Sequence, residues 1–162
     1  MRLSKGDLRM LATPNTFSLT AGRAEGGAAL TAFDGALLDA GLGNLNLIKV
    51  SSIVPPGARL VALPNIPPGS LVPVAYGTIV SNVEGEVISA GVAVGLTGDT
   101  FGMIMEHAGR CRRRETEEVL ERMVFEAVER RGMKVKEYMV KAVEHTVVRC
   151  GCVFAAVALW YD

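Results

Sequence analysis

Two adjacent serines, Ser51 and Ser52, are the first candidates for chemistry in this sequence, and they stand in "GNLNLIKVSSIVPPGARL" at residues 43–60. The residues before them alternate in polarity as a strand does, and Pro55 and Pro56 behind them cannot donate hydrogen bonds to a sheet. A serine at such a boundary is either the polar end of a strand or a nucleophile that attacks a nearby carbonyl. The stretch alone leaves both interpretations open.

Two glycines just upstream, Gly41 and Gly43 in "AGLGNLN", resemble part of a dinucleotide-binding loop. The third glycine of that loop is replaced by Asn46, and a predicted helix precedes the stretch while a predicted strand follows it, the reverse of the required order. We therefore reject a dinucleotide site and expect these glycines to end the helix.

The histidines and cysteines match no metal motif, because the sequence contains no Cys-x-x-Cys pair. The residues concerned are His107, Cys111, His145, Cys150 and Cys152. A Cys-x-Cys pair in a β-rich tail is typical of core packing, so we expect no metal site.

The residue types of a hydrolase triad are present as Ser52, His145 and Asp34. No Gly-x-Ser-x-Gly turn accompanies them, and both histidines stand beside a carboxylate in strand-like surroundings, which favours structural roles. Residue types alone leave the triad open.

Composition indicates one compact domain of 162 residues, 49% hydrophobic and 21% charged. Seventeen basic residues balance seventeen acidic ones, so we expect neither nucleic acid nor membrane as a partner. No apolar run approaches the ~20 residues of a membrane span, and three cysteines suit a reducing compartment. The expected location is the cytoplasm.

The periodicity of apolar residues predicts the strands and helices that position the candidate residues. Strands are predicted at residues 16–22, 44–50, 71–85, 86–96, 100–106, 137–148 and 152–161, and helices at 31–41 and 115–132. The last strand is apolar on both faces, which requires cover on both sides. We expect an α+β fold, a four-layer αββα sandwich of two packed, mainly antiparallel sheets flanked by helices.

Six segments, taken in order, resemble the pyruvoyl-dependent arginine decarboxylases across nearly the whole chain. They are "PNTFSLTAG", "AFDGALLDAGLGNLN", "LIKVSSIVPPGA", "VPVAYG", "MIMEHAGRC" and "AVEHTVVRCGCVFAAVALWY". The resemblance implies decarboxylation of L-arginine to agmatine and CO2, in polyamine biosynthesis, with a pyruvoyl group in place of pyridoxal phosphate. It also implies a trimer with sites between subunits, and a dimer of trimers is the alternative higher assembly.

The same resemblance implies that the proenzyme cuts itself between Ser51 and Ser52. The Ser52 hydroxyl attacks the Ser51 carbonyl, and elimination then leaves chains 1–51 and 52–162, the second beginning with the pyruvoyl group. Asp34 would pair with the substrate guanidinium, Glu106 would donate a proton, and Asn46 would serve processing or substrate.

Each of these roles has a simpler alternative. Asp34 suits a helix N-terminus, and Glu106 suits an exposed strand end. If residues 46–52 are extended, Asn46 lies ~20 Å from Ser52, so either the segment bends or Asn46 serves a neighbouring copy. We predict the second. Two other functions stay open, namely a pyruvoyl decarboxylase for another amino acid and an uncleaved, non-catalytic ligand-binding relative.

Overall fold

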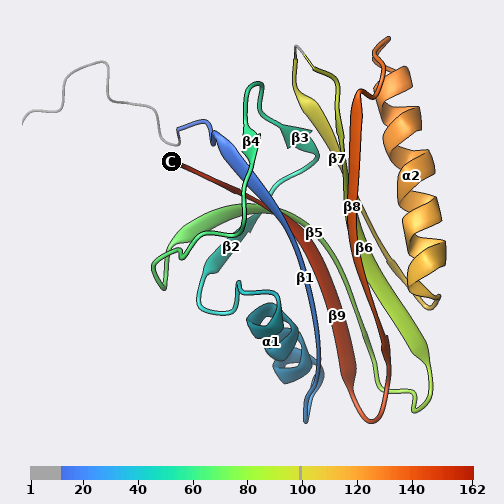
Figure 1. Cartoon of the computed structure of the whole chain (residues 1–162). Coiled ribbons are helices and arrows are strands. Elements are labelled where there is room, and N and C mark those ends of the chain that lie inside the picture. Colours follow the sequence, from blue (N-terminus) through green and yellow to red (C-terminus); the bar gives the residue numbers. More distant parts are fainter. Residues whose placement is uncertain (1–11, 99) are drawn as a thin grey trace, which may run out of the picture.

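The computed structural model describes residues 12–98 and 100–162, and its strands form two packed sheets (Figure 1). The five-stranded sheet has the order β2-β5-β9-β1-β4 and the four-stranded sheet the order β3-β7-β6-β8. The strands are β1 (Thr16–Glu25), β2 (Asn46–Lys49), β3 (Ile53–Val54), β4 (Arg59–Leu60), β5 (Leu71–Ser81), β6 (Val87–Leu96), β7 (Gly102–Gly109), β8 (Glu137–Thr146) and β9 (Gly151–Trp160). Pairing is antiparallel except between β2 and β5 and between β1 and β4.

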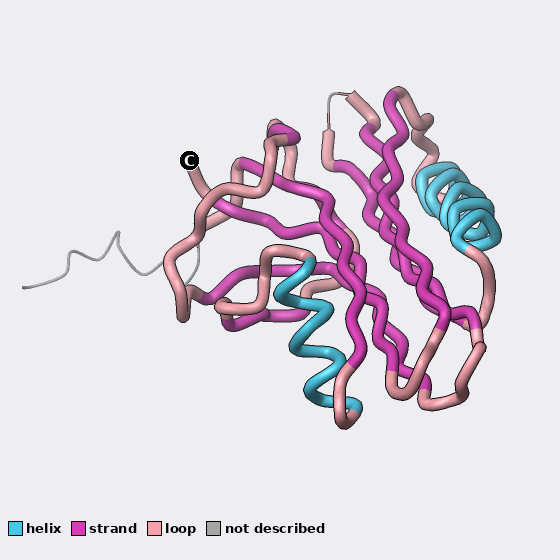
Figure 2. Tube along the Cα trace, turned by 60° about the horizontal axis from the view of Figure 1, so that its bottom comes forward, coloured by secondary structure: helices cyan, strands magenta, loops and turns pink. Residues whose placement is uncertain are grey.

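One helix covers the outer face of each sheet, as Figure 2 shows from a second side. Helix α1 (Ala29–Asp39) packs on the five-stranded sheet through Ala32 and Ala36, and α2 (Arg113–Glu129) packs on the four-stranded sheet through Leu120 and Val124. The core between the sheets contains Phe17 and other large apolar side chains. The predicted four-layer sandwich is confirmed.

The central strand β9 explains much of this architecture. Residues 151–159 are buried, because one face of the strand joins the core between the sheets and the other lies under α1. All ten residues of β1 pair with β9, from Thr16 opposite Trp160 to Glu25 opposite Gly151. Strand β1, which precedes the serine pair in the chain, is therefore hydrogen-bonded along its whole length to the central strand of the sheet.

Several element boundaries differ from the predicted ones. Strand β1 runs on to Glu25, and α2 begins at Arg113 because Glu144 on β8 accepts a hydrogen bond from the Arg113 backbone N–H at 2.8 Å. A partner from a distant strand thus satisfies a free N–H of the first helical turn. Within the described residues, no helix is long and apolar enough to cross a membrane.

Candidate active site

The Ser51–Ser52 peptide bond lies where the chain passes from one sheet to the other. Val50 N–H donates to the Val74 carbonyl of β5 at 3.0 Å and so holds the chain to the five-stranded sheet. The Ser52 carbonyl accepts from Ile104 N–H of β7 at 2.7 Å, and β3 then pairs with β7. We call residues 50–52 the crossover. Ser51 is its middle residue, between two points of backbone attachment.

Around the crossover the surface is hollowed by about 270 Å³. The lining residues are Ala12, Pro14, Val50, Ser51, Ser52, Ile53, Pro73, Leu159 and Tyr161. Ser51 is exposed and Ser52 is half-buried. The mostly apolar lining and the Ser52 carbonyl fixed by Ile104 N–H fit a small ketone-bearing group at position 52.

Glu106 lies on β7, two residues beyond Ile104 and therefore on the same face of the strand. Ile104 belongs to the core between the sheets, so Glu106 faces the five-stranded sheet. The sheets come close here, since a Cβ on Gly77 would lie 3.2 Å from the His107 carbonyl oxygen. Burial raises the pKa of the Glu106 carboxyl above its ordinary value, and the charge of Lys49 opposes that rise.

The sequence interpretation missed Lys49 and Tyr76. The Lys49 ammonium lies 4.5 Å from the centroid of the Tyr76 ring, a cation–π contact. Tyr76 in turn packs on Phe154, with ring centroids 5.2 Å apart. The signal that could have found this pair was a cation three residues before Ser52 in an otherwise apolar segment.

Asn46 begins β2, at the end away from the serines. Its side-chain N–H donates to the Gly69 carbonyl at 2.9 Å, and residues 46–49 are extended beside β5. The single chain thus holds the Asn46 amide away from the hollow at Ser52.

Asp34 is exposed on the outer side of α1. Leu30 and Leu38 stand four residues before and after it, and they are 76% and 53% exposed, which makes a leucine–carboxylate–leucine stripe on one face of the helix. Asp34 does not line the hollow at Ser52.

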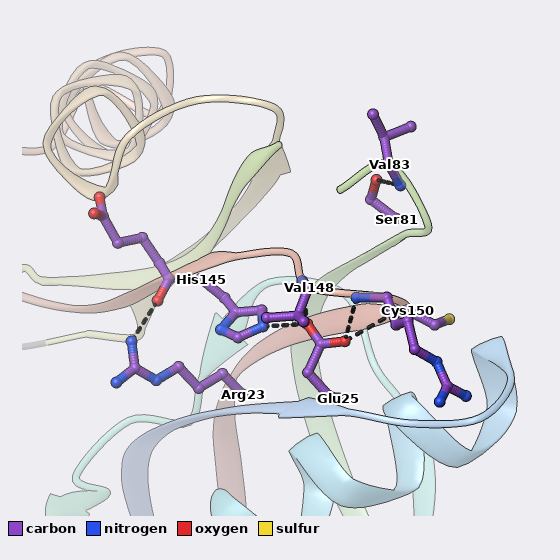
Figure 3. Close-up of polar contacts among 9 residues, drawn as sticks. Arg23, Glu25, Ser81, Val83, His145, Val148 and Cys150 are labelled. Carbon is purple, nitrogen blue, oxygen red and sulfur yellow. Dashed lines mark hydrogen bonds and ion pairs between the residues drawn. The ribbon is translucent and has the colours of Figure 1, made fainter. Parts of the chain in front are cut away.

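The other chemical candidates lie elsewhere. His145 N–H donates from Nε2 to the Glu25 carboxylate at 2.6 Å (Figure 3), so this imidazole is engaged at the end of β1 instead of at Ser52. Cys111 contacts the Ser89 hydroxyl at 3.3 Å, and Cys152 contacts that of Thr78 at 3.4 Å. Among the described residues, the His, Cys, Asp and Glu side chains form no group of three arranged to hold a metal ion.

Comparison with known proteins decides the family. The family model described as "Pyruvoyl-dependent arginine decarboxylase (PvlArgDC)" matches residues 16–162. The chain belongs to the pyruvoyl-dependent arginine decarboxylase family. Its relatives include proteins with that name from Methanocaldococcus jannaschii, 52% identical over 150 residues (91% of both chains), and Methanococcus maripaludis strain C7, 48% identical (91% of this chain, 92% of the relative). One from Pyrococcus horikoshii is 46% identical over 138 residues (83% and 87%).

Family membership confirms the predicted enzyme class, a pyruvoyl-dependent arginine decarboxylase, and the pyruvoyl group as its cofactor. Position 52, with its fixed carbonyl and apolar surroundings, fits that group. The matched span contains the serine pair, Glu106, Asp34 and Asn46.

Proposed function

We propose that this chain cuts its own backbone between Ser51 and Ser52 and then decarboxylates L-arginine to agmatine and CO2. The observation that carries the proposal is the crossover: one exposed residue, Ser51, lies between a backbone anchored to Val74 and a backbone anchored to Ile104. Anchors on both sides restrict how the Ser52 hydroxyl can meet the carbonyl before it.

The proposed cleavage needs only atoms of the chain itself and one molecule of water. The Ser52 Oγ attacks the Ser51 carbonyl carbon, and the peptide C–N bond breaks as an ester forms. Loss of the residue 52 α-proton then breaks its Cβ–Oγ bond, which releases a carboxylate at Ser51. Water removes the nitrogen of the remaining dehydroalanine as ammonia and leaves a pyruvoyl group at the start of chain 52–162.

The fold predicts that the two pieces stay together after cleavage. Strand β1 of the first piece pairs along its whole length with β9 of the second, and β2 pairs with β5. Helix α1 of the first piece packs through Ala32 and Ala36 into the cluster that contains Phe154 of β9. Release of residues 1–51 would expose these surfaces to water, which is unfavourable.

In the mature site, the pyruvoyl carbonyl supplies the electrophile that takes the substrate amine and accepts the electrons left when CO2 departs. The residues of this chain do the remaining work. Glu106, held half-buried on β7, keeps a proton to higher pH than an exposed carboxyl and donates it to the former α-carbon. The apolar lining at position 52 offers a surface against which the aliphatic part of the substrate can pack.

Arginine recognition is assigned to Asp34 and its flanking leucines. A guanidinium binds a carboxylate through two parallel hydrogen bonds. The aliphatic stem of the arginine substrate can pack on the exposed side chains of Leu30 and Leu38. Because Asp34 and Asn46 both lie away from the hollow at Ser52, we assign them to the site of a neighbouring copy in a trimer.

Mixed assemblies test the sharing of sites. Asp34→Asn and Glu106→Gln chains, each inactive or weak alone, are co-expressed with different tags and purified together. If the two residues act across an interface, random mixing restores about a quarter of the sites. If both act within one chain, the mixture shows only the sum of the two weak activities, and the shared-site assignment is wrong.

The substrate and the reaction have a direct test. Release of labelled CO2 is measured from arginine, ornithine, lysine and aspartate at equal concentrations. Arginine should be preferred, because it alone offers a planar fork to Asp34. Equal release from ornithine or lysine would favour the broader pyruvoyl decarboxylase, and an uncleaved chain that releases nothing would favour the ligand-binding relative.

A further inference from the structure

The C-terminal end of the chain forms part of the hollow around the crossover. Leu159 and Tyr161 border this hollow together with Ser51 and Ser52, although they lie far from the serines in sequence. Leu159 belongs to the core between the sheets, whereas Tyr161 follows the last residue of β9 and is partly exposed. Tyr161 has the largest side chain of the residues that border the hollow, so its ring decides much of the shape of that hollow.

Two contacts hold the Tyr161 side chain in place. Its hydroxyl donates a hydrogen bond to the Ala12 carbonyl at 3.0 Å, and Ala12 also borders the hollow. Its ring meets that of Trp160 at an interplanar angle of 62°, with the centroids 5.4 Å apart. Because the hydroxyl hydrogen is engaged by Ala12, the ring contributes to the hollow by its shape rather than by proton transfer.

Asn15 fixes the backbone on both sides of Tyr161. Its backbone N–H donates to the Trp160 carbonyl at 3.1 Å, and its side-chain Oδ1 accepts from Asp162 N–H at 2.9 Å. Its own carbonyl accepts from Arg59 N–H at 3.0 Å, and the Arg59 guanidinium pairs with the Asp162 carboxylate. We call Asn15, Arg59 and Asp162 the terminal junction. It joins the segment before β1, strand β4 and the C-terminus.

The terminal junction also holds the chain that leaves the crossover. Ile104 N–H fixes the Ser52 carbonyl, and the following turn is closed by a hydrogen bond of 3.1 Å from Ala58 N–H to the Pro55 carbonyl. The next residue, Arg59, belongs to the junction. The backbone on the C-terminal side of the serines and the Tyr161 ring are therefore held by the same set of contacts.

We propose that Tyr161 is a positioning residue for self-cleavage: its ring forms the wall of the hollow that keeps the Ser52 hydroxyl aimed at the Ser51 carbonyl carbon. This inference rests on the proposed cleavage between these two serines. The step concerned is the shift from amide to ester, in which the Oγ–C bond forms, the C–N bond breaks and the hydroxyl proton passes to the nitrogen of residue 52. Small displacements of reacting groups slow such a step strongly.

The first test follows the uncut fraction of freshly purified chains during warm incubation, by denaturing electrophoresis. Tyr161→Ala removes the wall and should be cut about 10-fold or more slowly than the original chain. Tyr161→Phe keeps the ring and loses only the hydrogen bond to Ala12, so its rate should stay within about threefold of the original. An original rate in Tyr161→Ala overturns the proposal.

A second variant and a control accompany this test. If Tyr161→Ala does not fold, Asn15→Ala decides, because it removes the acceptor for Asp162 N–H; it should also slow cleavage, and an unchanged rate overturns the proposal. Glu25→Gln weakens contacts at the far end of β1 and leaves the hollow intact, so it should be cut at the original rate. Equal slowing of Glu25→Gln and Tyr161→Ala would assign the effect to stability and overturn the proposal.

Hydroxylamine reads the assisted step itself, because it cuts an ester under conditions that leave a peptide bond intact. Folded Tyr161→Ala should be cut by hydroxylamine about 10-fold more slowly than the original chain, whereas equal cutting would place the effect of Tyr161 after ester formation and contradict the positioning role. An original chain that stays full length with or without hydroxylamine contradicts the proposed cleavage itself. An original chain that is cut no faster than Tyr161→Ala contradicts the role of Tyr161 alone.

Discussion

The two ends of the sandwich join the sheets in opposite ways (Figure 1). At the crossover, backbone hydrogen bonds of Val50 and Ser52 hold the chain to different sheets, with one exposed residue between them. At the far end of β1, the Glu25 carboxylate accepts hydrogen bonds from His145 and from the backbone N–H groups of residues 148–150 (Figure 3). We call this second arrangement the Glu25 clasp.

This difference indicates which covalent bond the fold can lose. The Glu25 clasp links β1 of one sheet to β8 of the other and to the turn before β9, with contacts of 2.6 to 2.9 Å. A side chain on Gly151 would collide there, since its Cβ would lie 2.8 Å from the Glu25 carboxylate. Strand pairing within each sheet, the apolar core between the sheets and the clasp therefore hold the fold together independently of the Ser51–Ser52 bond.

The largest expected effect is that of Ser52→Ala, which removes the attacking oxygen. This chain should stay full length and show no decarboxylation, because the pyruvoyl group cannot form. Denaturing electrophoresis and CO2 release measure the two results. Ser51→Ala is the matched control: it keeps the attacked carbonyl and should still be cut. Cleavage in Ser52→Ala would refute the assigned nucleophile.

Glu106→Gln comes next, since it keeps the shape of the side chain but cannot supply the proton. Cleavage should proceed, while kcat should fall about 10²-fold or more. Steady-state rates of CO2 release, corrected for the cleaved fraction, provide the measurement. A normal kcat would remove Glu106 from the mechanism.

A smaller loss is expected for Asp34→Asn, which leaves the crossover intact. The KM for arginine should rise about 10- to 100-fold, from the loss of a charge-assisted hydrogen bond worth ~1.5–3 kcal/mol, with less change in kcat. Asp39→Asn on the same helix is the control, because Asp39 accepts a hydrogen bond from Arg23 N–H at 2.8 Å. Similar KM values for the two variants would argue against Asp34 as the guanidinium partner.

The smallest effect on activity is expected at the Glu25 clasp, where stability alone should change. Burial pushes the pKa of Glu25 upward, but the three backbone N–H groups and His145 outweigh it and hold the pKa at about 2, against an ordinary 4.5. The clasp therefore stabilises the fold above pH 4.5, and this contribution is lost as the pH falls toward 2.

Glu25→Gln tests the clasp. The variant should lose roughly 1–2 kcal/mol of unfolding free energy at neutral pH, with unchanged cleavage, and its stability should depend less on pH below 4.5 than that of the original chain. Denaturant unfolding across this range measures both results. Blocked cleavage in Glu25→Gln would show that the two ends of the molecule are coupled.

Periodicity predicted the layers of the fold because they depend on local patterns. The doubly apolar segment at residues 152–161 required cover on both faces, and β9 has it from α1 and from the other sheet. The start of α2 was misplaced because its cap, Glu144, comes from a strand 31 residues away in sequence. Such long-range partners leave no periodic signal.

The candidate site was predictable only in part for the same reason. The serine pair stood out at a strand boundary, but its position between two anchors depends on Val74 and Ile104, which are distant in sequence. The contact between the Lys49 ammonium and the Tyr76 ring could not be predicted, because Tyr76 lies on β5, which is distant in sequence. The strand predicted at residues 44–50 is present as Asn46–Lys49, and the neighbouring-copy role of Asn46 stays a prediction.

The central claim is that cleavage at the crossover makes the pyruvoyl group without dissolving the fold, and intact mass measured before and after denaturation tests it most directly. The native species should contain residues 1–51 and 52–162 together. After denaturation the two should separate, the second lighter by one ammonia than a chain that begins with serine. A single full-length mass, or a second chain with an unmodified N-terminal serine, would contradict the account.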